Sequence, residues 1–482
     1  MKMFRYSWLA VIALLLVLVS ACGGEAPTAT TAPAAATDTP AAAAAATATP
    51  AAAAAATDTP AAAAAATDTP AAAAAATDTP AAAAPAATDT PAPTETPAVL
   101  GSSSAKTTIT IWHNWEGEYY KPIAGIFNDY VTAHPDVSIN LLHVPDLENK
   151  VKNAVPAGAG PDIIAWVDDH IGEDALIGVI DPLDDLKGAG IDKAYLQANY
   201  PQVAQDAVTY DGKIYGLPES MEAVTMIYNK KLITEDKLPK NTTELMEMAK
   251  AYNQANPGQY FAVWNPKDAY FNAWLFYGAG AFYVDENGNV GLNTPEGIAA
   301  GKYIQDAQAI LPKDVDYGVA DSLFKDGKAP IILNGPWYIA DLQKAGIDFG
   351  LAKLPAIDFG KKGPAKQFVG VKVVMLAHGS KNPDIAADVM KYYTSKDAQM
   401  KLAEGVVPAQ NDAAAARAND PIVAGFNAQA KDGVPLPNTP FMTQLWDPVA
   451  KGLTTLFTTN KDPKDVMAEV QKTAEDNIAK MK

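Results

Sequence analysis

A tryptophan near the end of one short apolar stretch of this chain is followed directly by a run of polar side chains. The stretch covers residues 163–167 and includes Trp166, and Asp168, Asp169 and His170 follow it directly. It is too short for a helix and follows a Gly-Pro turn signal, which is typical of a buried strand. Ligands of open α/β sheets bind beyond the carboxyl ends of strands, so the arrangement predicts a small-molecule site. A core tryptophan followed by helix-capping aspartates would give the same pattern, and this segment alone leaves both interpretations open.

Other tryptophans occupy comparable positions, just after a predicted strand or near a loop. With Trp166 they are Trp115, Trp337 and Trp446. Aromatic rings stack on the apolar C–H faces of sugars, and carboxylates accept charge-assisted hydrogen bonds from neighbouring hydroxyls. Each tryptophan taken singly is a common core residue. Together, with Asp169, Glu222 and Asp268 as candidate neighbours, they favour a carbohydrate-binding cleft.

The elements that must position these side chains alternate between strands and helices in a βαβ pattern. Residues 107–112, 137–144 and 163–167 predict strands, and a helix at 122–134 and a Gly-rich loop separate them, as in a doubly wound sheet. Further strands are expected at 214–218, 221–228, 330–334, 349–354 and 369–376, and further helices at 241–253 and 299–309. The part from 107 to 482 exceeds what one hydrophobic core normally organises, so we expect two domains.

The first residues predict a secretory signal peptide over residues 1–21. Lys2 and Arg5 precede an apolar run of residues 8–19, and small residues lead to Cys22. As a helix the run reaches only about 18 Å, short of the roughly 30 Å hydrocarbon core, so a permanent span is not expected. The run resembles the lipobox of bacterial lipoproteins, which implies that Cys22 becomes lipidated and holds the protein at the outer face of the cell membrane. An unmodified cysteine in a secreted chain is the alternative.

Cys22 is also the only cysteine of the chain. Disulfides, a thiolate nucleophile and a cysteine-based zinc site are therefore excluded from the rest of the protein.

Residues 22–106 predict a low-complexity tether. Their composition is dominated by Ala, Thr, Pro and Asp, and a repeated unit places its prolines at Pro40, Pro50, Pro60, Pro70 and Pro80. Proline interrupts the helix that the alanine blocks would favour, and the lack of large apolar side chains leaves nothing to offset the ordering entropy. A repeat solenoid would need an apolar face for stacking, which is missing. Whether the threonines carry glycans and whether the alanine blocks are transiently helical stays open.

The formal net charge of −18 points away from some partners. An acidic chain without clusters of Lys and Arg is not expected to bind nucleic acid, or a membrane other than through its lipid.

No cofactor or metal is predicted. Tyr119 and Tyr120 could ligate ferric iron only with further anionic ligands. Asp285 begins a calcium-loop pattern, but Val290 occupies the position that needs glycine. A hairpin turn at Asn287 and Gly288 is the working interpretation.

Several motifs along the chain resemble one family. They are Gly160-Pro-Asp-Ile-Ile-Ala-Trp166, Met221-Glu-Ala-Val-Thr-Met-Ile-Tyr-Asn-Lys230, Asn334-Gly-Pro-Trp337, Phe368-Val-Gly-Val371, and Pro437-Asn-Thr-Pro440 through Trp446. In this order they resemble maltose/maltodextrin-binding proteins, the extracellular solute-binding components of ABC sugar importers. The resemblance covers nearly all of 107–482.

The resemblance implies an α/β, two-lobed periplasmic-binding-protein-like fold of type II. A ligand cleft would lie between the lobes, three hinge crossovers would join them, and the lobes would close on the ligand. Lobe one would comprise 107–220 plus 372–418, and lobe two 221–370 plus 420–482. The implied function is that of a monomeric, lipid-anchored receptor that binds maltose or maltodextrin and delivers it to a membrane permease.

Site residues carry over from the resemblance position by position. Sugar-stacking aromatics correspond to Trp166, Tyr270, Trp337 and Trp446. Acidic positions correspond to Asp169 and Glu222 as hydroxyl acceptors, Glu148 at the cleft rim, Asp268 in place of a glutamate and Glu116 in place of an aspartate.

The chain also departs from the family pattern. Gly117 replaces a lysine, and His170 and Ala450 each replace an arginine. Trp115 would add a stacking surface. These departures leave the exact sugar open, and another sugar or a polyol is the first alternative.

Two residues and two other classes of protein complete the interpretation. Glu222 either contacts the ligand or bonds backbone across the hinge, and Asp162 is expected to cap its turn. A cell-surface glycoside hydrolase would need one carboxylate as acid and another as base or nucleophile, and no motif marks such a pair. No nucleophile elbow or His-Glu-x-x-His motif occurs either, so an enzyme is not expected. A structural surface lipoprotein would explain the tether but not the aromatic residues at strand ends.

Overall fold

The structure, a computed structural model, describes residues 98–481. The predicted signal peptide 1–21, Cys22 and residues 22–97 of the predicted tether lie outside the described residues. The tether prediction is wrong at its carboxyl end, because Ala98–Leu100 form strand β1, which pairs antiparallel with β3 (Val137–His143). Apolar Val99 and Leu100 follow the last prolines of the tether, and they extend the edge of the sheet.

A large sheet dominates the part of the protein that contains β1. It has 8 strands in the order β1-β3-β2-β4-β14-β7-β15, and β16 pairs with β14. The strands not yet given are β2 (Thr107–His113), β4 (Ile163–Val167), β14 (Phe368–Leu376), β7 (Gly216–Glu222), β15 (Val407–Pro408) and β16 (Val434–Pro435). β3, β2 and β4 are parallel, and β14 runs antiparallel to both β4 and β7. The carboxyl ends of β2, β4 and β7 therefore lie at one edge of the sheet.

A second sheet has 4 strands in the order β13-β8-β12-β9. These are β13 (Phe349–Ala352), β8 (Thr225–Asn229), β12 (Ile331–Asn334) and β9 (Ala262–Val263). The expected strand at 221–228 is thus divided, since Glu222 ends β7 in the large sheet and Thr225 begins β8 in the small one. The chain changes sheets between these two residues.

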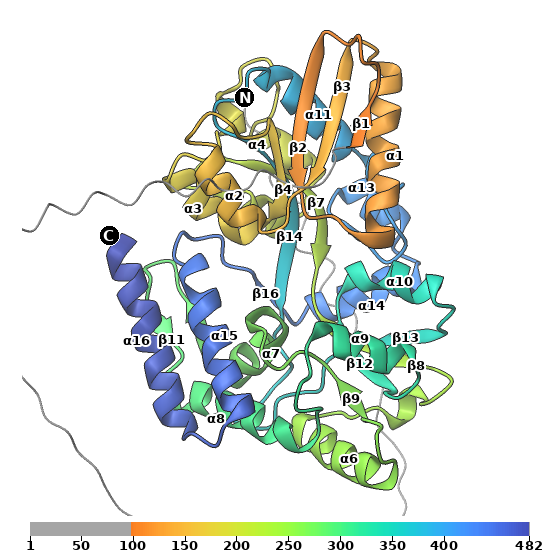
Figure 1. Cartoon of the computed structure of the whole chain (residues 1–482), viewed down its shortest axis with the longest axis vertical. Helices are drawn as coiled ribbons and strands as arrows, with labels where there is room; N and C mark the ends of the chain where they lie inside the picture. The colour runs from red at the N-terminus through yellow and green to blue at the C-terminus, as the bar shows by residue number, and fades with distance from the viewer. Residues whose placement is uncertain (1–97, 482) are drawn as a thin grey trace, which may run out of the picture. The chain divides into compact units, whose positions relative to one another are not determined.

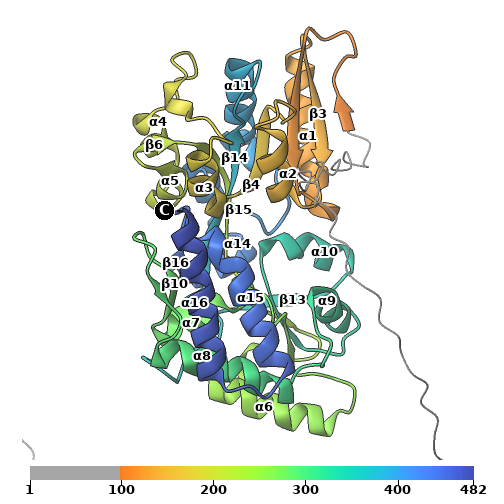
Figure 2. The same ribbon diagram turned by 60° about the vertical axis from the view of Figure 1, so that its left-hand side comes forward.

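Helices pack around both sheets (Figure 1). Around the large sheet they are α1 (Gly117–Ala133), α2 (Leu147–Ala154), α3 (Ile171–Leu176), α4 (Lys193–Asn199), α5 (Gln202–Ala207), α11 (Pro383–Tyr393), α12 (Lys396–Gln399) and α13 (Asn411–Ala416). Around the small sheet they are α6 (Thr242–Ala255), α7 (Ala269–Ala279), α8 (Pro295–Asp306), α9 (Tyr317–Lys325), α10 (Ile339–Lys344), α14 (Pro421–Ala430), α15 (Thr443–Thr458) and α16 (Pro463–Met481). Figure 2 shows α15 and α16 side by side next to α8.

Local sequence signals account for several element limits. Asn241 caps α6 by accepting a hydrogen bond from the Glu244 backbone N–H, as the capping pattern predicts. α1 begins earlier than expected, because Pro122 stands inside the helix rather than at its start. The helix forgoes one backbone hydrogen bond at that proline.

The hairpin interpretation of 285–290 is confirmed. β10 (Phe282–Val284) pairs antiparallel with β11 (Val290–Gly291), and Gly288 has φ +79°. The Asp285 carboxylate accepts backbone N–H groups of Asn287 and Asn289, so it stabilises the turn. A smaller hairpin joins β5 (Thr209–Tyr210) and β6 (Lys213–Ile214).

Asp162 also has a structural role. Its carboxylate accepts the Thr110 backbone N–H at 2.9 Å and the Ser380 hydroxyl at 2.6 Å, and so fixes the turn that leads into β4.

The buried apolar residues form two cores. One draws on residues 109–217 and 371–409, and we call it the large-sheet core. The other draws on 224–368 and 423–478 together with Val407, and we call it the small-sheet core. The chain passes between them at 217–224, 368–371 and 409–423, and β7 and β14 lead across this junction (Figure 1). The lobe limits derived from the sequence stay a prediction.

Within 98–481, no helix combines the length and apolar character needed to cross a membrane.

Candidate functional site

The edge of the large sheet at the junction of the two cores gathers polar side chains from several strands. Asn114 and Glu116 follow β2, Asp169 and His170 follow β4, and Glu222 ends β7. Three-residue 3-10 turns shape two of the approaches: η1 (Asp168–His170) after β4 and η5 (Pro336–Tyr338) after β12. Parallel strands end at the same edge, so residues far apart in sequence meet there.

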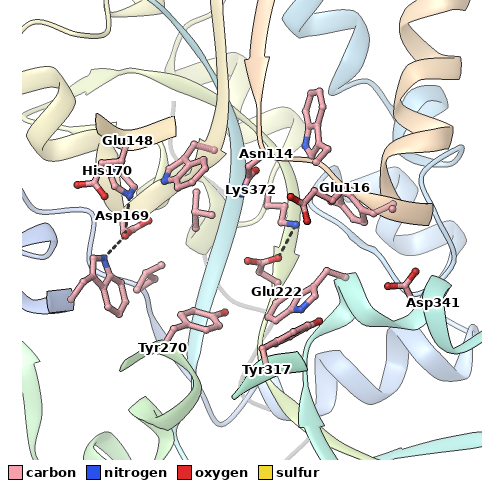
Figure 3. A pocket seen from close by; sticks show the side chains of 18 residues that line it. Asn114, Glu116, Glu148, Asp169, His170, Glu222, Tyr270, Tyr317, Asp341 and Lys372 are labelled. Carbon is pink, nitrogen blue, oxygen red and sulfur yellow. Dashed lines mark hydrogen bonds and ion pairs between the residues drawn. The ribbon is translucent and has the colours of Figure 1, made fainter. Parts of the chain in front are cut away.

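These residues line one cavity with a volume of about 680 Å³, within the usual range of small-molecule sites. Its walls combine both cores (Figure 3). They consist of Asn114, Trp115, Glu116, Gly117, Tyr119, Glu148, Trp166, Val167, Asp169, His170, Glu222, Tyr270, Tyr317, Trp337, Asp341, Lys372, Leu436 and Trp446. All residues predicted from the sequence for the site are present except Asp268.

Asp169 is held in place by a residue from the other core. The indole Nε1 of Trp446 on α15 donates to Asp169 Oδ2 over 2.7 Å. His170 Nε2 lies 3.7 Å from the same oxygen, and the His170 ring meets Trp166 edge to face with centroids 5.5 Å apart. The bond from Trp446 leaves Asp169 further lone pairs for a ligand hydroxyl.

A close backbone contact accounts for the position of α15 against this turn. A Cβ atom on Gly172 of α3 would lie 2.3 Å from the Asn438 carbonyl oxygen, so glycine is needed for the segment before α15 to approach α3. The Asn438 amide in turn donates to the backbone carbonyls of Asp206, Ala207 and Thr209, each over 3.0 Å. These contacts fix the segment from which Trp446 reaches Asp169.

Aromatic rings form the wall contributed by the small-sheet core. Tyr270 on α7 and Trp337 in η5 have ring centroids 6.2 Å apart, and both side chains are only half-buried. The Tyr270 hydroxyl has no hydrogen-bond partner among the described residues, although it is buried. Burial raises the pKa of Tyr270 well above its usual value, so the hydroxyl stays protonated. It is a free polar group that a ligand can satisfy.

Glu222 lies beside a lysine that the sequence reasoning did not select. Lys372 Nζ on β14 is 3.4 Å from Glu222 Oε2 and 4.2 Å from the centre of the Tyr119 ring. Burial raises the pKa of Glu222, while Lys372 acts in the opposite direction. Tyr119 donates its hydroxyl to Glu219 over 2.5 Å, which fixes the ring beneath the ammonium group.

The other carboxylates of the cavity wall belong to Glu148, Glu116 and Asp341 (Figure 3). Glu148 on α2 pairs with Lys152 at 2.8 Å, and Glu116 pairs with His143 at 3.0 Å. The Glu116 side chain is largely exposed.

The structure does not support two of the predicted roles. Trp115 borders the cavity but is only 4% exposed, and its ring packs on His113, Phe127 and Tyr393. The ring is therefore mainly part of the large-sheet core. Asp268 does not line the cavity and instead caps α7 by accepting the Phe271 backbone N–H over 2.9 Å.

Sequence reasoning missed Lys372, Tyr317, Asp341, Asn114 and Tyr119 as wall residues. A signal existed for Lys372, because it is the only charged residue within the otherwise apolar strand Phe368–Leu376. Tyr317 and Asp341 come from α9 and α10 and meet the cavity only through tertiary packing, so no local pattern marks them.

Comparisons with known proteins agree with this architecture. A family model described as "Bacterial extracellular solute-binding protein" matches residues 125–425. The maltotriose-binding protein of Pyrococcus abyssi is 34% identical over 383 residues, which cover 77% of this chain and 82% of that protein. The galactooligosaccharide-binding protein of Bacillus subtilis is 27% identical over 401 residues, 78% of this chain and 91% of that one.

A solved structure shows the same fold. The Thermus thermophilus maltotriose binding protein, bound with maltotriose, superimposes with a TM-score of 0.70 at 28% identity and covers 77% of this chain and 100% of its own. The α/β fold of periplasmic-binding-protein type expected from the sequence is confirmed. The chain belongs to the family of bacterial extracellular solute-binding proteins.

Proposed function

We propose that this protein binds a neutral oligosaccharide of the maltotriose or maltodextrin kind in the 680 Å³ cavity and delivers it to an ABC import permease. The observation that carries the proposal is the joint presence of half-buried aromatic rings and carboxylates around one cavity. The rings are Trp166, Tyr270, Trp337 and Trp446, and the central carboxylates are Asp169 and Glu222. Similarity to maltotriose-binding proteins supports the choice of sugar.

Each kind of side chain has a distinct role in this proposal. The aromatic rings stack on the apolar faces of the sugar rings, where water is displaced at little cost. Asp169 and Glu222 accept hydrogen bonds from hydroxyls, and Glu148 and Glu116 offer further acceptors. Carboxylates outnumber cationic groups around the cavity, so an anionic sugar would be repelled. No arginine lines the cavity among residues 98–481, which leaves a related sugar or polyol as the alternative ligand.

Closure would follow from the way the cavity is built. Lobe one (107–220 plus 372–418) provides Trp166 and Asp169, and lobe two (221–370 plus 420–482) provides Tyr270, Trp337 and Trp446. A ligand that touches both lobes binds the closed state more tightly and shifts the hinge equilibrium toward it. The segments that connect the two cores, at 217–224, 368–371 and 409–423, are the hinge in this proposal.

The protein would act as a monomer and release its ligand unchanged. A lipid on Cys22 would hold it at the outer face of the membrane, and the tether would give the body reach toward the permease.

Calorimetry with the full chain tests the proposal. We expect heat of binding for maltotriose and longer maltodextrins, weaker or no binding for glucose, and saturation at one ligand per chain. Maltose, trehalose, cyclodextrin and galacto-oligosaccharides complete the panel and define the sugar. No heat with any of these sugars would refute a carbohydrate ligand. Release of reducing ends during the titration would show that the protein is instead a glycoside hydrolase.

A further inference from the structure

Lys372 is a charged side chain in the middle of a buried strand. β14 lies between β4 and β7, and Lys372 is paired with Val167 on one side and Ser220 on the other. Its side chain is only 17% exposed. An ammonium group in such a place is unfavourable unless other groups compensate for the lost water.

The compensation comes from groups that hold the ammonium at the cavity wall. Its nitrogen is 3.4 Å from Glu222 Oε2, 4.2 Å from the Tyr119 ring centre and 5.9 Å from the Trp337 ring centre. The two aromatic rings stabilise the cation through their faces. The N–H groups of Lys372 that point away from the rings stay available as hydrogen-bond donors. Lys372 is therefore fixed in position while hydrogen-bonding capacity remains.

The ion pair itself is loose. A tight charge-assisted hydrogen bond between nitrogen and oxygen spans about 2.7–2.9 Å, so the 3.4 Å separation from Glu222 leaves both groups able to bond elsewhere. Among the described residues that line the cavity, Lys372 is the only lysine or arginine. The acidic residues of the wall are carboxylates that accept hydrogen bonds.

We propose that Lys372 is a ligand-contacting, specificity-determining residue that acts together with Glu222 on a vicinal pair of sugar hydroxyls. Lys372 donates to the oxygen of one hydroxyl, and the neighbouring hydroxyl donates to Glu222. The pair thereby selects a ligand with two adjacent hydroxyls over a ligand that lacks the hydroxyl bonded to Lys372. Gly117, in the loop after β2, stands where the resemblance implies a lysine. Lys372 on β14 supplies a cationic donor to the cavity in its place. The inference rests on the proposed function, because it deepens the recognition of the same sugar.

The alternative is that Lys372 only neutralises Glu222. A counter-ion would affect the binding of all ligands alike, whereas a donor to one oxygen matters only for ligands that carry that oxygen. Maltotriose and its monodeoxy analogues, each without one hydroxyl, distinguish the two roles.

The experiment measures the affinity of the full chain and its variants for this set. In the unmodified protein, we expect one analogue to bind about 10- to 150-fold more weakly than maltotriose, as for a hydrogen bond to a charged group. Lys372→Met should weaken maltotriose binding by a similar factor. The Lys372→Met variant should bind that one analogue as well as it binds maltotriose, within about twofold. It should still discriminate against the analogues that lack a hydroxyl at another position.

Lys230→Met is the matched control. Lys230 pairs with Asp348 at 3.5 Å, is half exposed and does not line the cavity, so the same substitution should leave all affinities unchanged. Lys372→Gln keeps a neutral donor on a side chain one atom shorter, and it replaces the methionine variant if that one does not fold. It should show a smaller, position-selective loss.

The outcomes distinguish failure of the Lys372 contact from failure of the proposed function. An equal loss for maltotriose and all analogues, or unchanged affinity, in the Lys372 variants would refute the contact while the sugar-binding function stands. Failure of the unmodified protein to bind maltotriose would refute the proposed function first, and the inference with it.

Discussion

Replacing Trp337 by alanine should weaken sugar binding while the fold persists. Trp337 stands in η5 at the cavity wall, with its ring centroid 6.2 Å from that of Tyr270 and 5.9 Å from the Lys372 ammonium. The ring is half-buried, so part of its face is available to a ligand. Alanine removes that face and one of the two aromatic contacts of Lys372.

The size of the effect follows from the burial of the ring by the sugar. Covering a large apolar side chain contributes about 1.5–3 kcal/mol, which corresponds to a loss of roughly 10- to 150-fold in affinity. The contact between Trp337 and Lys372 exists without ligand, so its loss lowers the stability of the fold, by about 0.5–2 kcal/mol, rather than the affinity.

Calorimetry with maltotriose, together with thermal unfolding, measures both consequences. Trp264→Phe is the control, since Trp264 is fully buried, bonds to Asn272 at 3.0 Å and lies away from the cavity. It should lower the melting temperature and leave the affinity within about twofold. Unchanged affinity in Trp337→Ala, or an equal loss in both variants, would refute the placement of the stacking surface.

Three further predictions follow from other parts of the chain. Burial raises the pKa of Asp174 to about 6, so the folded state binds a proton more tightly than the unfolded state and stability falls as the pH rises from about 4 to 6. Asp174→Asn should therefore raise the free energy of unfolding at pH 7 by about 1–3 kcal/mol and give no gain below pH 4; a pH-independent effect in denaturant titrations would contradict this. Gly172→Ala should lower stability by about 1–3 kcal/mol and weaken maltotriose binding, because its Cβ would meet the Asn438 carbonyl; an unaltered melting temperature would count against the close contact. Cys22→Ser should move the protein from the membrane fraction to the soluble fraction, and continued membrane attachment would refute the lipid anchor.

Local pattern predicted much of the fold. The limits of β4 coincide with the apolar run of residues 163–167, and the Asn241 cap begins α6 where the capping pattern placed it. The pattern could not divide 221–228 between two sheets, because the whole stretch alternates as one strand would. Only pairing with β14 on one side and β12 on the other shows that Glu222 and Thr225 belong to different strands.

The site was predictable where strand ends carry it. Trp166 and Asp169 follow β4, so the rule for carboxyl ends of strands places them correctly. Trp115 follows β2 in the same way, yet its ring turns into the core, where Phe127 and Tyr393 hold it. Tyr393 lies far along the chain, and no local signal indicates which way the tryptophan turns. The Asp268 carboxylate likewise caps a helix, α7, and this hydrogen bond holds it away from the cavity.

The most direct test of the central claim is a crystal structure of the protein with maltotriose. The account predicts glucose rings within the cavity, stacked on Trp337 and Tyr270, with hydroxyls bonded to Asp169 and Glu222. It also predicts ligand contacts from both cores. Maltotriose bound outside this cavity, or bound inside it with no contact to the aromatic wall, would contradict the account.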